Sequence, residues 1–155
     1  MNEFIIVSFL TERIPDSFER TTWPFHTTIL APFTTDLPPL EVQNILQQAA
    51  KEIPPFSTKG KSRELFGRDN TVSVTELYKT PELARLHMAL FEAFSDHAAF
   101  KSPDWVGENY RPHVTDTQNR QLRVMEEAII QAISLVELEH TQGLVLYTCE
   151  LAKPA

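Results

Sequence analysis

The chain has 155 residues with 14 basic and 21 acidic side chains, so its formal charge is −7. The length favours one domain over 1–155 with a sizeable hydrophobic core. The acidic balance argues against a protein that coats duplex nucleic acid, because such binding needs many Lys and Arg contacts to phosphates.

The N-terminal segment predicts two strands. The apolar run Phe4–Leu10 follows Glu3 instead of a basic segment, and it is far shorter than the roughly 18 residues of a membrane span. We therefore expect a buried first strand, no signal peptide and no membrane contact. After an irregular segment over 11–23, Phe25–Leu30 predicts a second strand that ends at Ala31–Pro32.

Two amphipathic helices flank a predicted hairpin. Apolar residues recur at helical spacing between Val42 and Ile53, and Pro54–Pro55 ends this helix. Phe56–Phe66 and Thr71–Tyr78 predict the two strands of the hairpin. A second helix begins near Pro81 and buries Leu83, Leu86, Leu90, Phe91 and Phe94.

The C-terminal part predicts a loop over 99–109, a short strand over Tyr110–Thr115, a third helix and a final strand over Leu144–Leu151. The third helix carries Leu122, Met125, Ile129, Ile130 and Ile133 on one face. The single cysteine, Cys149, cannot form an intramolecular disulfide, which predicts a reducing, cytoplasmic setting. The element order β-β-α-β-β-α-β-α-β is typical of an α+β fold.

One short pattern occurs twice, as His26-Thr27-Thr28 and as His113-Val114-Thr115. Each copy lies on a short predicted strand with a proline just upstream. Because residues i and i+2 of a strand point to the same face, each His projects together with a Thr. If the two strands lie side by side, two imidazoles and two hydroxyls line one cleft.

Those four side chains suit a phosphodiester. A neutral His takes a proton from water and a protonated His gives a proton to the leaving oxygen, since the pKa of imidazole lies near neutrality. The hydroxyls of Thr28 and Thr115 donate to the non-bridging phosphate oxygens. The pattern therefore predicts His26 and His113 as the catalytic pair, with no metal and no cofactor, and leaves open which His is the base.

The paired H-x-T motifs resemble those of the two-histidine (2H) phosphoesterase superfamily, which includes 2'-5' RNA ligase-like proteins and cyclic nucleotide phosphodiesterases. Phe25–Phe33 is similar to the first motif of that family and Tyr110–Thr115 to the second. The resemblance implies a bilobal fold, in which two antiparallel β-sheet lobes with flanking helices surround a central cleft. It also implies metal-free hydrolysis of 2',3'-cyclic phosphodiesters or 2'-5' linkages.

Asp116 departs from the family pattern, because an apolar residue such as Ile29 usually follows the motif threonine. Either Asp116 caps the next helix, where its carboxylate accepts from free backbone N–H groups, or the second half-site is modified. We favour the cap. How an anionic substrate is accommodated beside this carboxylate stays open.

Basic residues near the motifs offer local positive charge for a phosphate, or belong to a solvated face. They are Arg111, Arg120 and Arg123 around the second motif and Lys59, Lys61 and Arg63 in the hairpin. Among them we single out Arg111 as a candidate phosphate ligand.

Aromatic residues near the strands either stack on a base or belong to the core. The candidates for stacking are Phe25, Tyr110 and Tyr147. The other histidines, His87, His97 and His140, lack any metal-ligand spacing and are expected to be structural or exposed.

The sequence therefore predicts a phosphodiesterase for a small nucleotide or an RNA end, with a monomer as the default state. An alternative is a non-catalytic module that binds nucleotides or RNA ends, which Asp116 keeps open. A third alternative, a plain interaction domain, requires the two imidazoles to lie too far apart to flank one phosphorus.

Overall fold

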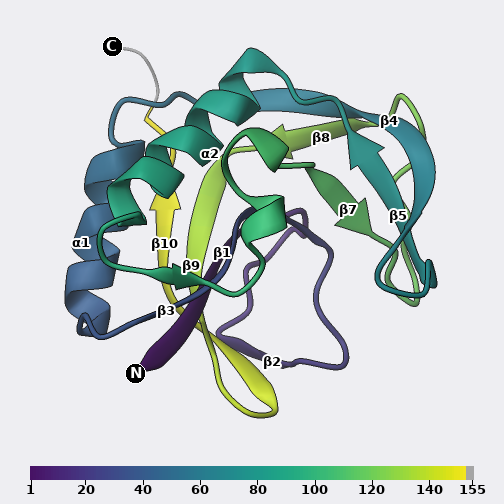
Figure 1. Ribbon diagram of the computed structural model, residues 1–155. Coiled ribbons are helices and arrows are strands. Elements are labelled where there is room, and N and C mark those ends of the chain that lie inside the picture. Colours follow the sequence, from purple (N-terminus) through teal and green to yellow (C-terminus); the bar gives the residue numbers. More distant parts are fainter. Residues whose placement is uncertain (153–155) are drawn as a thin grey trace.

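Ten strands and two helices form the computed structural model, which describes residues 1–152 (Figure 1). The last three residues of the expected domain lie outside the described residues. The strands are β1 (Asn2–Phe9), β2 (Ser17–Glu19), β3 (His26–Thr35), β4 (Phe56–Phe66), β5 (Val72–Leu77), β6 (Ala99–Phe100), β7 (His113–Thr115), β8 (Glu127–Ile130), β9 (Ala132–Leu138) and β10 (Gln142–Glu150). The helices are α1 (Pro39–Ala50) and α2 (Pro81–Phe94), and two 3-10 turns cover Pro103–Trp105 and Gly107–Asn109.

The strands form one hydrogen-bonded path in the order β2-β10-β9-β1-β3-β7-β5-β4-β8, and β6 pairs with β3. All pairings between these strands are antiparallel. The helices pack on each other, α2 also contacts β3 and α1 also contacts β10 (Figure 1). A curled antiparallel sheet with two helices confirms the predicted α+β class.

Alternate residues of β1 belong to two different hydrophobic clusters. Phe4 and Ile6 lie in the main core, which joins the helices to the sheet. Ile5, Val7 and Phe9 lie in a smaller cluster. Since neighbouring residues of a strand point to opposite faces, both faces of β1 are covered. The smaller cluster lies beside the first motif, because Phe9 pairs with the residue at position 26.

Several elements lie where the sequence predicts them: the first strand, the helices α1 and α2, and the β4–β5 hairpin. The Thr80 hydroxyl caps α2 by accepting the N–H of Leu83 at 3.2 Å. β3 is longer than predicted, because it continues through Ala31–Pro32 and ends at Thr35, opposite Asn2 of β1. Short pieces of regular structure, β2, β6 and the 3-10 turns, occupy segments predicted to be irregular.

The prediction of a third helix is wrong. The segment instead forms β8, which pairs with β4, followed by β9, which pairs with β1. Met125 has a φ of 72°, which no right-handed helix contains, and its N–H donates to the Gly60 carbonyl at 2.8 Å. Burial alternates along β8, with Ala128 and Ile130 buried while Ile129 is 49% exposed. The apolar spacing matched a helix by coincidence, and pairing with β4 decides the structure.

Candidate active site

The two H-x-T motifs lie on neighbouring antiparallel strands. Thr27 of β3 pairs with Val114 of β7. This register sets His26 beside Thr115 and Thr28 beside His113, and all four side chains point to the face opposite Thr27 and Val114. The structure thus brings the four predicted residues together on one face of the sheet.

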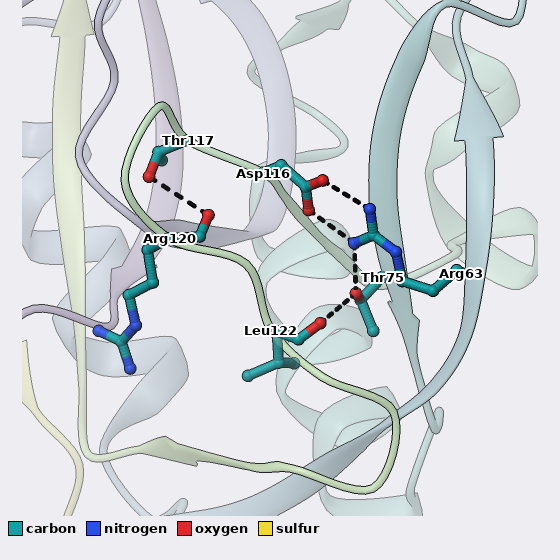
Figure 2. Close-up of polar contacts among 6 residues, drawn as sticks. All are labelled: Arg63, Thr75, Asp116, Thr117, Arg120 and Leu122. Atoms are coloured by element: carbon teal, nitrogen blue, oxygen red, sulfur yellow. Dashed lines mark hydrogen bonds and ion pairs between the residues drawn. The ribbon is translucent and has the colours of Figure 1, made fainter.

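Buried polar contacts fix β7, a strand of only three residues, between its neighbours. The Thr27 hydroxyl donates to the His113 carbonyl at 2.8 Å, across the β3–β7 pair. On the other side, Thr75 of β5 pairs with Val114, and its hydroxyl donates to the Leu122 carbonyl (Figure 2). Thr27, Val114 and Thr75 have no exposed surface, so the position of the second motif is set by packed and hydrogen-bonded neighbours.

The two imidazoles have equivalent hydrogen bonds. Nδ1 of His26 lies 2.8 Å from the Pro24 carbonyl oxygen, and Nδ1 of His113 lies 2.9 Å from the Arg111 carbonyl oxygen. A carbonyl oxygen only accepts, so each Nδ1 carries the hydrogen and donates it. In the neutral rings Nε2 therefore holds the lone pair. Within residues 1–152, no hydrogen bond to protein occupies either Nε2 or the hydroxyls of Thr28 and Thr115.

Aromatic rings surround both imidazoles. The Trp23 ring centroid lies 4.5 Å from that of His26, and the Phe66 and Trp105 centroids lie 4.7 and 5.7 Å from that of His113. This apolar environment disfavours the charged imidazolium. The pKa of His26 is lowered to about 4, mainly by burial and to a lesser extent by the nearby His113, although the bond to Pro24 opposes the shift.

The pKa of His113 is also lowered by burial, but a carboxylate opposes the shift. Glu76 of β5 pairs with His113 across the sheet, and its negative charge favours the imidazolium. Glu76 also forms a bidentate ion pair with Arg111, with an Nη2–Oε1 distance of 2.7 Å and an Nε–Oε2 distance of 3.1 Å. The bond to Arg111 is the main reason that the pKa of Glu76 lies below its usual value. The two histidines therefore differ in their electrostatic surroundings.

Asp116 does not cap a helix, because strand structure replaces the predicted third helix. Its carboxylate forms a bidentate ion pair with Arg63 of β4, with both N–O distances at 2.6 Å (Figure 2). Arg63 also donates to the Thr75 hydroxyl, at 2.9 Å. Asp116 follows Thr115, so it projects toward the opposite face of β7. The carboxylate that sets this motif apart is thus neutralised by its ion pair with Arg63.

A groove of about 1050 Å³ runs from His26 and Thr115 along the segments at 20–25 and 115–120. Its polar lining consists of Thr11, Arg20, Thr21, Thr22, Thr115, Asp116, Thr117, Gln118, Asn119 and Arg120. Asp116, already paired with Arg63, is the one carboxylate in this lining among the described residues. A net positive groove therefore lies beside the motifs of an acidic protein.

The positions of the predicted stacking residues do not suit that role. Tyr110 is 5% exposed, its hydroxyl donates to the Thr28 carbonyl at 2.8 Å, and its ring stacks on His87 with centroids 3.9 Å apart. Phe25 is 4% exposed and is covered by the Arg120 guanidinium. Tyr147 packs against the main core rather than beside the motifs. Tyr110 and Phe25 therefore belong to the packed scaffold of the site.

His87 is a structural residue, as expected from the sequence. Its Nδ1 lies 2.7 Å from the Ile29 carbonyl oxygen, and its Nε2 accepts the Gly107 N–H at 2.9 Å. With one nitrogen donating and the other accepting, the buried ring is neutral, which agrees with a pKa lowered by burial. His87 and Tyr110 together hold the β3 backbone just after the first motif.

Sequence reasoning missed Trp23, Phe66, Trp105 and Glu76. Only Trp23 had a local signal, three residues before His26. Phe66 and Glu76 reach the site through strand pairing between segments dozens of residues apart, which no local sequence pattern predicts. Among residues 1–152, no group of three or more His, Cys, Asp or Glu side chains is placed to hold a metal ion, and no helix is long and apolar enough to cross a membrane.

A family model described as the 2'-5' RNA ligase superfamily matches residues 11–143. The match includes both motifs and most of the chain. The chain belongs to the 2'-5' RNA ligase superfamily. This membership confirms the resemblance to the 2H phosphoesterases that the H-x-T motifs suggested.

Solved structures share the fold of this superfamily member at low sequence identity. A protein described as a phosphoesterase is 13% identical, with a TM-score of 0.66 over 99% of this chain and 100% of its own. LigT of E. coli, solved in complex with 3'-AMP, is 14% identical, with a TM-score of 0.63 over 98% and 99%. The protein TT0787 of Thermus thermophilus is 16% identical, with a TM-score of 0.63 over 100% of both chains. No protein of curated function has a matching sequence.

Proposed function

We propose that this 2'-5' RNA ligase superfamily member hydrolyses 2',3'-cyclic phosphodiesters or 2'-5' linkages of nucleotides or RNA ends, without a metal. The observation that carries the proposal is the matched geometry of His26 and His113. Each ring donates Nδ1–H to the carbonyl two residues upstream, and each Nε2 is free on the shared face. Such a pair supplies both proton transfers that hydrolysis of a phosphodiester requires.

In this proposal His26 is the general base and His113 is the general acid. With a pKa of about 4, His26 is neutral at neutral pH, so its Nε2 accepts a proton as a water oxygen attacks phosphorus. Glu76 favours the protonated form of His113, whose Nε2–H is given to the ribose oxygen as the bond from phosphorus to that oxygen breaks. His26 takes up one proton and His113 releases one, so the total charge of the pair is unchanged, with His26 now protonated and His113 neutral.

The threonines and Arg111 are the proposed phosphate ligands. The hydroxyls of Thr28 and Thr115 flank the imidazoles and donate to the non-bridging oxygens, where negative charge is held in the transition state. Arg111 lies two residues before His113, and Glu76 occupies two of its five N–H donors. The remaining donors are available to a phosphate oxygen.

The direct test is turnover by the purified protein in the presence of EDTA. We expect hydrolysis of adenosine 2',3'-cyclic phosphate or of the 2'-5' adenylyl dinucleotide, with the products resolved by chromatography and an unchanged rate after chelation. Binding of both compounds without any product would contradict the proposal and favour the non-catalytic module. A rate abolished by EDTA and restored by a divalent cation would overturn the metal-free mechanism.

A further inference from the structure

The groove beside His26 is larger and more positively charged than one cyclic mononucleotide requires. Its volume of about 1050 Å³ lies just above the roughly 300–1,000 Å³ of small-molecule sites. Two of the four motif side chains, His26 and Thr115, line it, and it also contains two guanidinium groups, those of Arg20 and Arg120. These features suit a ligand that extends past the reacting phosphate.

Arg120 is fixed in position yet keeps free donors. One N–H donates to the Leu10 carbonyl at 2.8 Å, and the guanidinium lies over the Phe25 ring, 4.4 Å from its centroid. The Arg120 carbonyl accepts the Thr117 N–H at 2.9 Å and the Thr117 hydroxyl at 3.4 Å, which closes the loop after the second motif; Figure 2 shows the hydroxyl contact. In Figure 2 the Arg120 side chain points away from Arg63 and Asp116. No carboxylate among residues 1–152 pairs with it.

Arg20 is held in the same manner on the opposite segment of the groove. Its Nη1 donates to the Glu139 carbonyl at 2.8 Å, and its backbone N–H donates to the Thr141 carbonyl at 2.9 Å. In both arginines one guanidinium N–H donates to a backbone carbonyl, and the other N–H groups are free to bind a ligand in the groove. Anchored, planar guanidinium groups recognise phosphate oxygens at low entropic cost.

A neighbouring cavity shares Arg120 with the groove but carries more negative charge. A second cavity of about 550 Å³ adjoins the groove at Arg120 and is lined by the carboxylates of Glu12, Glu127 and Glu150. Those carboxylates repel an anion, whereas the one carboxylate of the groove is paired with Arg63. A phosphate that approaches Arg120 is therefore directed to the His26 side.

We propose that Arg120, with Arg20, binds the phosphate next to the reacting one, so that the preferred substrate is an oligonucleotide end rather than a mononucleotide. This inference rests on the proposed function and specifies its substrate. The reacting phosphate sits at the four motif side chains, and the chain upstream of it lies in the groove with its internal phosphate on the two guanidinium groups.

The test compares adenosine 2',3'-cyclic phosphate with an adenylyl dinucleotide that ends in the same cyclic phosphate. For the wild-type protein we expect kcat/KM to be about tenfold or more higher for the dinucleotide, as for a hydrogen bond to a charged group. Arg120→Ala should remove most of this preference and leave the mononucleotide rate within about twofold. Arg123→Ala is the matched control, because Arg123 is on the same segment, exposed and outside the groove lining.

A dinucleotide with a neutral methylphosphonate at the internal position should behave in the wild-type protein as the normal dinucleotide does in Arg120→Ala. The mononucleotide rate reports folding of each variant. Equal losses on both substrates, or no wild-type preference for the dinucleotide, would overturn the inference. If the wild-type protein hydrolyses neither compound, the proposed function fails. The role of Arg120 is then decided by calorimetry, in which the dinucleotide should bind the wild-type protein about tenfold more tightly than Arg120→Ala.

Discussion

His26 and His113 have the same hydrogen bond to the backbone but different neighbours. His26 faces Trp23 and Phe9, and no carboxylate contributes to its pKa. His113 faces Phe66 and Trp105, with Glu76 across the strand pair. The two motifs have the same H-x-T pattern in sequence, and the difference between the histidines arises only from strand pairing, which brings Glu76 beside His113. It is the basis on which base and acid are assigned.

The pH dependence of the reaction tests the role of Glu76. The charged groups around His113 are Glu76 on β5, which raises its pKa, and Arg111, which lowers it. In Glu76→Gln the first influence is lost and Arg111 is freed, so both changes lower the pKa of His113 further. The protonated acid then disappears at a lower pH, and the alkaline limb of the kcat/KM profile moves to lower pH.

Because burial lowers the pKa of His113, we expect the wild-type profile to decline at a pH below the usual histidine range, and that of Glu76→Gln to decline at a still lower pH. Steady-state rates between about pH 4 and 9 measure both limbs. Glu92→Gln, an exposed change on α2, is the control and should leave the profile unchanged. An identical alkaline limb in Glu76→Gln would refute the role given to this carboxylate.

At the scale of elements, strand pairing determines secondary structure where local sequence patterns do not. The helices and the β4–β5 hairpin follow from apolar spacing and proline boundaries, which act over a few residues. β8 could not be predicted, because its pairing with β4 spans about 70 residues of sequence and overrides a helical apolar spacing. Asp116 was misassigned for the same reason, since its partner Arg63 lies on β4.

Gly60 of β4 makes the turn into β8 possible. Its N–H donates to the Glu126 carbonyl and its carbonyl accepts from Met125, so the segment before β8 lies directly against it. A Cβ atom at position 60 would collide with the Arg123 carbonyl oxygen. No side chain fits between these two backbones.

We therefore expect Gly60→Ala to lower the free energy of unfolding by about 1–3 kcal/mol, the range for overpacked sites. Urea denaturation measures this change. Ser57→Ala, an exposed substitution on the same strand, should change the free energy of unfolding by less than about 0.5 kcal/mol. Equal stability of Gly60→Ala and wild type would contradict this expectation, because it would mean that the Arg123 backbone moves aside without loss of stability.

For the whole molecule, a formal charge of −7 and a phosphate site are compatible because charge is distributed unevenly. Arg20 and Arg120 line the groove beside the first motif, while Arg63 neutralises Asp116 and Arg111 pairs with Glu76. The paired motifs made the four central residues and the family predictable from sequence. The aromatic surroundings and the groove arise from residues that meet only in the folded chain, so they were not.

The most direct test of the account is the rate of 2',3'-cyclic nucleotide hydrolysis by His26→Ala and His113→Ala, each beside His97→Ala, in which an exposed histidine is removed. General acid–base groups contribute roughly 10²–10⁴-fold, so we expect each motif variant to lose at least about a hundredfold in kcat while its circular dichroism and cooperative unfolding persist. His97→Ala should retain the wild-type rate. A folded His26→Ala or His113→Ala protein with full activity would contradict the two-histidine mechanism.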